Sequence, residues 1–246
     1  MTQTALVTGA ASGLGKVIAT HLLQQGFQLV LTDVNLQRAQ QAARELDSHG
    51  ERVLALGLDI RQVQDVERAL AATLERFGSL EVLVNNAALT LATPVMNIQP
   101  DEFDQVLTTN LRGTFVSCQT AGRYFAERGY GRIINLASLA GQNGGTASGA
   151  HYAASKGGIL TLTKVFAREL SQSGVTVNAI APGPLDLPSV HALVPAEKLA
   201  GLLQMIPVGK LGDAEFVAQA VALLASPQAA FVTGATWDIN GGLFMR

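Results

Sequence analysis

Residues 4–15 of the chain read TALVTGAASGLG, an apolar run that leads into glycines at positions 9, 13 and 15. Apolar residues then recur at helical spacing, at Leu14, Val17, Ile18 and Leu22. A glycine turn between a strand and a helix exposes backbone N–H groups at the positive end of the helix dipole, where a phosphate binds well. Such turns also use glycine for steric reasons alone. The pattern predicts a dinucleotide pyrophosphate held by Gly9, Ser12, Gly13, Leu14 and Gly15.

The alternation of strand and helix continues to the end of the chain. Short apolar runs are separated by longer segments with apolar residues three and four apart. Parallel strands need helical crossovers that cover both faces of their sheet. The sequence therefore predicts one α/β domain over residues 1–246, a Rossmann-type doubly wound parallel sheet of seven strands flanked by helices. The expected strands are Thr4 to Thr8, Phe27 to Asp33, Val53 to Leu58, Leu80 to Asn85, Arg132 to Ala137, Val175 to Ile180 and Ala235 to Ile239.

The charged residues nearly balance, with 17 Lys and Arg against 19 Asp and Glu, and the sequence pI is about 6.1. A nucleic-acid-binding domain normally has a basic face and a pI above about 9, so this class of partner is excluded. No apolar run reaches the roughly 18 to 20 residues of a membrane span, and the first strand leaves no room for a signal peptide. Cys118 is the only cysteine, and no Cys/His spacing predicts a metal site. We expect a cytoplasmic protein that binds neither metal nor membrane.

An acidic residue, Asp33, ends the second expected strand, 18 residues after the last glycine of the turn. In dinucleotide-binding folds, an acidic residue about 20 residues after that turn binds the ribose hydroxyls. A carboxylate there repels a 2′-phosphate, and the adjacent Val34 and Asn35 supply no cation, so the sequence favours NAD(H) over NADP(H). Asp33 could instead cap the following helix, as Asn35 also could. Asp59, followed by Ile60, comes directly after the third expected strand and is expected either at the adenine or at a helix N-cap.

The segment YAASK places Tyr152 four residues before Lys156, and Ser138 lies 14 residues before the tyrosine. Residues four apart share a helix face, so both are expected at the carboxyl edge of the sheet, where open α/β folds bind ligands. The pKa of a tyrosine is near 10, and an adjacent ammonium and a positive nicotinamide ring would lower it. We predict that Tyr152 is a general acid/base for hydride transfer and that Ser138 donates to the substrate oxygen. His151 is expected to pack, because adjacent helical residues point about 100° apart.

These motifs together resemble the classical short-chain dehydrogenase/reductase family, over essentially the whole chain. The resemblance rests on the glycine turn, Asn85-Asn86-Ala87, Asn110, the Ser138, Tyr152 and Lys156 set, and Pro182-Gly183. It implies that Asn110 holds a water linking Lys156 to solvent in a proton relay. It also implies cofactor contacts from Asn86, Tyr152, Lys156, Pro182, Gly183 and Leu185.

Two positions depart from that family's pattern. Ala88 stands where a glycine is usual, which is tolerated if its φ is negative. After Pro182-Gly183, many members have a threonine that bonds the nicotinamide amide, whereas this chain has Leu187. Asp186 or Ser189 could replace that threonine, and the sequence does not decide between them.

Three segments are expected to wall the substrate cavity: Leu89 to Met96, Leu139 to Ala150, and a lid at about 184–212. They are mostly small or apolar, and the first two contain no arginine that could clamp a carboxylate. The predicted substrate is therefore a neutral, fairly apolar secondary alcohol or ketone.

Two alternative functions remain open. Within the family, the chain is similar to the 3-oxoacyl-carrier-protein reductases, which act on a β-ketoacyl thioester. Those typically prefer NADPH and carry basic surface residues, whereas this chain has Asp33, and Ser173 where an arginine is frequent. The other alternative is a catalytically silent dinucleotide-binding regulator, which would have no need of Tyr152 or Lys156. The family commonly forms homotetramers, so one is expected here, through Asp101 to Arg128, Tyr152 to Ser171 and Trp237 to Arg246.

Overall fold

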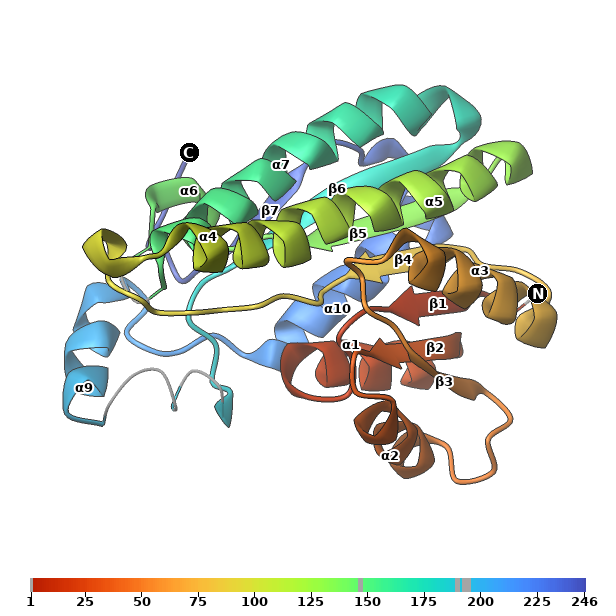
Figure 1. The fold of residues 1–246 in the computed structure, drawn as a ribbon, viewed down its shortest axis with the longest axis horizontal. Helices are drawn as coiled ribbons and strands as arrows, with labels where there is room; N and C mark the ends of the chain where they lie inside the picture. Colours follow the sequence, from red (N-terminus) through yellow and green to blue (C-terminus); the bar gives the residue numbers. More distant parts are fainter. Residues whose placement is uncertain (1, 146–147, 189–190, 192–195) are drawn as a thin grey trace.

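The computed structural model describes residues 2–145, 148–188, 191 and 196–246. Its centre is a seven-stranded sheet in the order β3-β2-β1-β4-β5-β6-β7, and all neighbouring strands are parallel (Figure 1). The predicted fold class is confirmed, and each strand lies within two residues of its expected bounds. The strands are β1 (Thr4–Val7), β2 (Gln28–Asp33), β3 (Val53–Gly57), β4 (Val82–Asn85), β5 (Gly131–Leu136), β6 (Val175–Pro182) and β7 (Thr236–Ile239).

Helices cover both faces of this sheet (Figure 1). One face is covered by α1 (Gly13–Gln24), α2 (Leu36–Leu46) and α10 (Ala214–Ala225). The other is covered by α3 (Val63–Phe77), α5 (Gly113–Arg128) and α7 (Ala150–Leu170). Three shorter helices lie near the carboxyl ends of the strands: α4 (Pro100–Leu107), α6 (Ala140–Asn143) and α9 (Ala196–Met205). Among the described residues, none of the helices is long and apolar enough to cross a lipid bilayer.

The five inner strands of the sheet are largely buried on both faces, which explains their nearly continuous apolar sequences. In β1, Ala5 and Val7 belong to the core layer under α1 and α10, whereas Leu6 belongs to the layer under α3 and α5. Successive side chains of a strand point to opposite faces, so each strand contributes to both layers. The sheet is therefore a rigid platform for the loops that leave its carboxyl edge.

The strand order reverses between β1 and β4, because the chain moves outward from β1 to β3 and then returns to β4. Loops on either side of such a reversal diverge and leave a crevice outside the carboxyl ends of the strands. The loop after β1 contains the glycine turn, the loop after β4 contains Asn86, and the loop after β5 contains Ser138. The fold therefore brings the predicted cofactor and catalytic residues to one edge.

Candidate active site

The turn after β1 is shaped by contacts that require glycine. A Cβ at position 15 would lie 2.4 Å from the carbonyl oxygen of Gly9 and 2.5 Å from Nδ2 of Asn86. At Gly13 a Cβ would meet nothing within 4 Å, so space does not require glycine there. Its φ of +55° does, because residues with a side chain rarely adopt that conformation. Ser12 is the N-cap of α1, yet its side chain makes no capping hydrogen bond. The first N–H groups of α1 thus have no side-chain cap, as suits a site for a phosphate.

Asn86 holds this turn from the end of β4. Its Nδ2 donates to the carbonyl oxygens of Thr8 and Gly9, at 3.0 and 3.1 Å. The backbone N–H groups of Asn86 and Ala87 both donate to the hydroxyl of Thr8, at 3.0 Å. Asn86 therefore shapes the predicted phosphate turn, in addition to lying where it could contact a cofactor. No described residue other than glycine has a positive φ, so Ala88 replaces the family's glycine without strain.

A cleft of about 430 Å³ lies beside the glycine turn. Its volume is within the range of small-molecule sites, roughly 300 to 1,000 Å³. The cleft gathers residues from the loops after β1, β2, β3 and β4, which are far apart in the sequence. Six residues predicted to bind the cofactor line it: Gly9, Ser12, Asp33, Asp59, Ile60 and Asn86.

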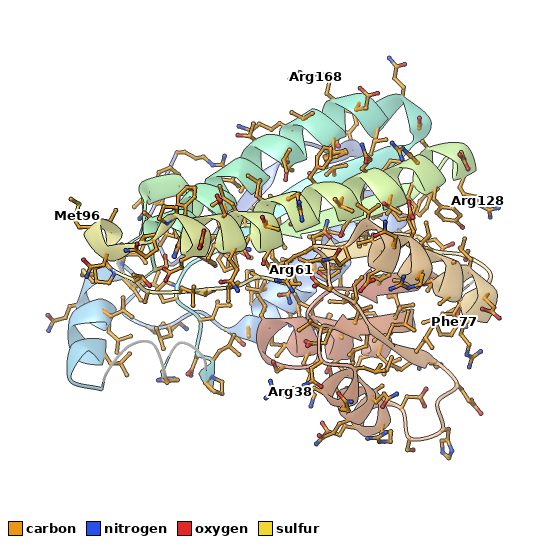
Figure 2. All side chains as sticks on the ribbon, in the orientation of Figure 1. Arg38, Arg61, Phe77, Met96, Arg128 and Arg168 are labelled. Carbon is orange, nitrogen blue, oxygen red and sulfur yellow. The ribbon has the colours of Figure 1, made fainter. Side chains whose placement is uncertain are left out.

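Asp33 lies half-buried in the lining of this cleft. It accepts a hydrogen bond from the backbone N–H of Asn35 at 3.0 Å. The N-cap of α2 is Asn35 itself, whose Oδ1 accepts the N–H of Arg38 at 3.0 Å. The alternative that Asp33 caps the helix is therefore wrong. Arg38, labelled in Figure 2, is exposed and is not part of the cleft lining, so it does not offset the charge of Asp33 there.

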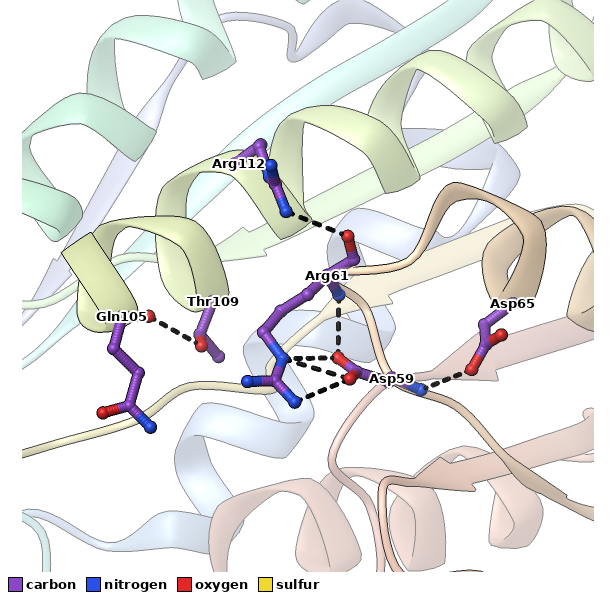
Figure 3. Close-up of polar contacts among 6 residues, drawn as sticks. All are labelled: Asp59, Arg61, Asp65, Gln105, Thr109 and Arg112. Carbon is purple, nitrogen blue, oxygen red and sulfur yellow. Dashed lines mark hydrogen bonds and ion pairs between the residues drawn. The ribbon is translucent and has the colours of Figure 1, made fainter. Parts of the chain in front are cut away.

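Asp59 enters the cleft as one half of an ion pair with Arg61 (Figure 3). The Nε of Arg61 lies 2.9 and 3.0 Å from the two carboxylate oxygens, Nη2 lies 2.7 Å from one of them, and the backbone N–H of Arg61 donates at 3.0 Å. These hydrogen bonds hold the pKa of Asp59 below its usual value. Arg112 donates to the carbonyl oxygen of Arg61 at 3.2 Å and fixes the loop.

The N-cap alternative for Asp59 is also wrong, because α3 begins at Val63 and its N-cap is Gln62. Arg61 itself was not among the predicted site residues, although it lines the cleft. The sequence hints at a role for Arg61 only through its place two residues after Asp59. Loop residues follow no periodic pattern, so that spacing did not predict the ion pair.

The helix α7 carries the tyrosine and the lysine to the carboxyl end of β5. The Nζ of Lys156 lies 5.7 Å from the centroid of the Tyr152 ring and donates to the carbonyl oxygen of Leu136 at 2.5 Å. The Lys156 side chain is buried, and burial lowers its pKa to about 8. Ser138 follows β5, and its hydroxyl accepts the N–H of Ala140 at 3.1 Å. The structure therefore brings three of the four predicted catalytic residues, Ser138, Tyr152 and Lys156, to the same end of β5.

The pKa of Tyr152 is raised by burial, while side-chain hydrogen bonds with Ser138 and Thr90 lower it. Burial is the larger effect, so the protein alone holds this pKa above the usual value for tyrosine. The Lys156 ammonium and a bound, positive nicotinamide ring were together expected to lower this pKa. In the structure the amine lies over the Tyr152 ring and donates to the carbonyl oxygen of Leu136. Like Arg61, Thr90 was not among the predicted site residues. It was expected only as part of the wall of the substrate cavity.

Asn110 lies in a π-helical turn, Thr108–Arg112, between α4 and α5, and it is fully buried. Its Oδ1 accepts the N–H of Leu89 at 2.7 Å, and its Nδ2 donates to the carbonyl of Leu89 and to the hydroxyl of Ser155, both at 3.0 Å. These bonds join the loop after β4 to α7. Because the side chain is engaged, a proton relay at Asn110 would have to use its backbone carbonyl, which accepts the Thr114 hydroxyl at 2.7 Å.

The segment after β6 closes the opposite side of the crevice. The carbonyl of Pro182 accepts the N–H of Leu139 at 2.9 Å, and the N–H of Gly183 donates to Ile239 at 2.8 Å. Leu185 pairs with Gly212, so the two ends of the segment at 184–212 lie side by side. Asp186 is engaged by His191, at 2.7 Å. Asp186 and Ser189 were the two candidates to bond the nicotinamide amide in place of the family's threonine. Asp186 already has His191 as a partner, and Ser189 lies outside the described residues.

Comparisons with known proteins agree with this geometry. Residues 9–244 match the model of a short-chain dehydrogenase family described as enoyl-(acyl carrier protein) reductase. A 3-oxoacyl-[acyl-carrier-protein] reductase from Vibrio cholerae is 38% identical over 243 residues, which are 99% of this chain and 98% of the relative. The enzymes of the same name from Staphylococcus aureus and Escherichia coli are 37% and 36% identical, covering 99% and 97% of their own lengths. The chain therefore belongs to the short-chain dehydrogenase/reductase family, whose members use nicotinamide cofactors.

Proposed function

We propose that the protein is an NAD(H)-dependent oxidoreductase that interconverts a neutral, fairly apolar secondary alcohol and its ketone by hydride transfer. One observation carries this proposal: Tyr152, Ser138 and Lys156 converge at the carboxyl end of β5, at the edge of the sheet that also holds the glycine turn. Packing alone does not require a buried lysine beside a tyrosine at that edge.

In this mechanism the phenol of Tyr152 gives its proton to the carbonyl oxygen during reduction and takes it back during oxidation. Ser138 donates a hydrogen bond to the same oxygen and holds it near the phenol. A bound nicotinamide dinucleotide would supply or accept the hydride. Lys156, with a pKa of about 8, can give up a proton near neutral pH. It can therefore return a proton to the phenolate of Tyr152. The backbone carbonyl of Asn110 would hold a water molecule that links Lys156 to solvent and supplies it with a new proton.

The residues present fit a dinucleotide. The pyrophosphate would lie on the uncapped start of α1, against Gly9, Ser12, Gly13, Leu14 and Gly15. The cleft with Asp33, Asp59, Ile60 and Asn86 would hold the adenosine half. The other half would contact Tyr152, Lys156, Pro182, Gly183 and Leu185. The carboxylate of Asp33, which faces no cation in the cleft other than the paired Arg61, supports NAD(H) over NADP(H).

A second candidate substrate is a 3-oxoacyl thioester, and the printed names of the relatives favour it. The 3-oxo group of such a thioester is itself a neutral ketone, so the hydroxyls of Tyr152 and Ser138 would act on either substrate. The loop Leu89 to Met96 supplies an apolar surface, on which Met96 projects outward and is 91% exposed (Figure 2). The segment at 184–212, whose ends are held together by Leu185 and Gly212, is proposed as the lid over either substrate.

Consumption of reduced cofactor distinguishes these functions. The protein is mixed with NADH or NADPH and with acetoacetyl-CoA or a panel of simple ketones, and the loss of nicotinamide fluorescence is followed. Turnover of ketones with NADH supports the proposal, and turnover confined to the thioester selects the second candidate. A protein that binds NADH and turns over no carbonyl compound would instead be a regulator.

A homotetramer is also proposed. Phe103, Phe115 and Val165 lie on α4, α5 and α7 and expose between 37% and 49% of their surface, and large exposed apolar side chains are often covered by a partner. Light scattering coupled to size-exclusion chromatography measures the assembly, and a monomer at micromolar concentration would contradict this proposal. A cytoplasmic location stays a prediction.

A further inference from the structure

The residue that precedes the catalytic tyrosine, His151, is fully buried in the first turn of α7. Its Nδ1 lies 2.8 Å from the backbone nitrogen of Tyr152, which can only donate. A ring nitrogen that accepts a hydrogen bond carries no proton, so the proton of the neutral ring is on Nε2. That nitrogen lies 2.8 Å from Oε1 of Glu102. The imidazole therefore joins the catalytic helix to a carboxylate through one defined tautomer.

Glu102 lies in the first turn of α4 and serves two partners. Side-chain hydrogen bonds with Thr93 and with His151 hold the pKa of its carboxyl below the usual value, and Thr93 is the larger cause. Thr93 belongs to the loop Leu89 to Met96, which is expected to wall the substrate cavity. The carboxylate thus lies beside that loop and is joined to the start of α7 through the buried imidazole.

Gly149 makes room for the imidazole. A Cβ there would lie 2.3 Å from Cε1 and 2.8 Å from Nδ1 of His151. The N–H of Gly149 also donates to the carbonyl oxygen of Leu91 at 2.8 Å, which ties the same loop to the same helix end. The chain is therefore shaped at this point to admit a histidine ring.

The loop is bound to the reacting group as well. Thr90 lies close enough to Tyr152 to lower the pKa of its phenol, and both backbone groups of Leu89 are held by Asn110. Tyr152 is held at its backbone N–H by His151, and Ser138 and Thr90 lie close enough to its hydroxyl to lower its pKa. Movement of the loop or of the first turn of α7 would disturb both.

From these contacts we propose that Glu102 and His151 are positioning residues, which hold the Tyr152 phenol at the substrate oxygen by fixing the first turn of α7 and the loop Leu89 to Met96. This inference rests on the proposed role of Tyr152 as the acid/base. Neither residue touches substrate in this scheme, so both act through the tyrosine.

Four substitutions separate the contacts. His151→Asn keeps an acceptor at the position of Nδ1 but is too short to reach Glu102. His151→Leu removes both hydrogen bonds. Glu102→Ala removes the carboxylate, whereas Glu102→Gln keeps an oxygen that can accept from Nε2. A matched control is His21→Leu, because His21 is also buried and also pairs with a glutamate, Glu215, at 2.5 Å, but between α1 and α10.

The measurements are kcat and KM for carbonyl reduction, the dissociation constant for NADH, and Tm. We expect Glu102→Ala and His151→Asn each to lower kcat about tenfold, the effect of one lost hydrogen bond to a charged group, and His151→Leu to lower it about tenfold or more. The NADH dissociation constant should stay within about twofold of the parent value, since α7 does not bear the phosphate turn. Glu102→Gln should restore most of the lost kcat, and the control should keep the parent kcat whatever its Tm.

Parent kcat in both Glu102→Ala and His151→Asn would overturn the inference. So would a loss of kcat that Glu102→Gln fails to rescue, or one that the control reproduces in proportion to its change in Tm. Failure of the proposed function itself has a different signature, since either the parent protein would turn over no ketone or Tyr152→Phe would retain turnover. An inactive Tyr152→Phe together with unaffected Glu102 and His151 variants refutes the positioning role alone.

Discussion

Replacing Asp33 with asparagine tests the choice of cofactor. The amide keeps an oxygen for the Asn35 N–H and removes only the charge. A 2′-phosphate carries about 1.5 to 2 negative charges near neutral pH. At about 5 Å from the half-buried carboxylate, with an effective dielectric constant of about 40 to 80, the repulsion is about 1 to 3 kcal/mol. This corresponds to a preference for NADH of about 5- to 150-fold, which Asp33→Asn should largely remove.

The assay is kcat/KM for NADH and NADPH with one ketone, accompanied by fluorescence titration of each dinucleotide. Glu127→Gln serves as the control, because it removes the same charge from an exposed position at the far end of α5. Added salt should weaken the preference of the parent protein only partly, since Asp33 is not fully exposed. A parent protein that already prefers NADPH, or an Asp33→Asn variant with an unchanged ratio, would refute the reasoning from charge.

Three further outcomes are expected at the catalytic residues. Tyr152→Phe should lower kcat by about 10²- to 10⁴-fold while the NADH dissociation constant stays near the parent value; near-parent turnover would show that another group is the acid/base. The rate of alcohol oxidation should rise with pH, because the proposed reactive form of Tyr152 is the phenolate. Ser138→Ala should move that rise to higher pH, because Ser138 lowers the pKa of Tyr152. A pH profile unchanged by Ser138→Ala would argue against this contact. Lys156→Met should abolish turnover yet raise Tm at pH 7, and a clear fall in Tm would show that the buried amine stabilises the fold.

The fold was predictable because its signals are local. Apolar runs such as that of β1 are short and alternate with segments of helical period, and parallel strands joined by helices need crossovers that cover both faces of the sheet. Tyr152 and Lys156 could be paired in advance for the same reason, since their separation of four residues is a helical repeat. Placing Ser138 beside them required one further step. It follows a strand whose carboxyl end lies near the helix that carries Tyr152 and Lys156.

The remaining contacts of the site join segments without a common period. Arg61 reaches Asp59 within an irregular loop, and Thr90 meets Tyr152 across the crevice. His151 was predicted to pack, and it does, but its bond to Glu102 depends on how α4 lies against α7. No spacing in the sequence encodes the path of a loop between two helices, so these residues could be found only from the structure.

Lys156 shows how function opposes stability at this site. Its pKa falls from 10.5 to about 8 on burial, which at 1.36 kcal/mol per unit is a cost of about 3 kcal/mol for keeping the amine charged in the folded protein. Between those pH values the unfolded chain holds a proton that the folded chain has released, so stability rises with pH across this window and the cost is fully present below it. The bond to Leu136 offsets only part of that cost, because a single hydrogen bond to a charged group contributes about 1.5 to 3 kcal/mol. A core position selected for packing would hold methionine or leucine. The proposed proton transfer would explain a lysine buried there, at the carboxyl end of β5 and beside a tyrosine.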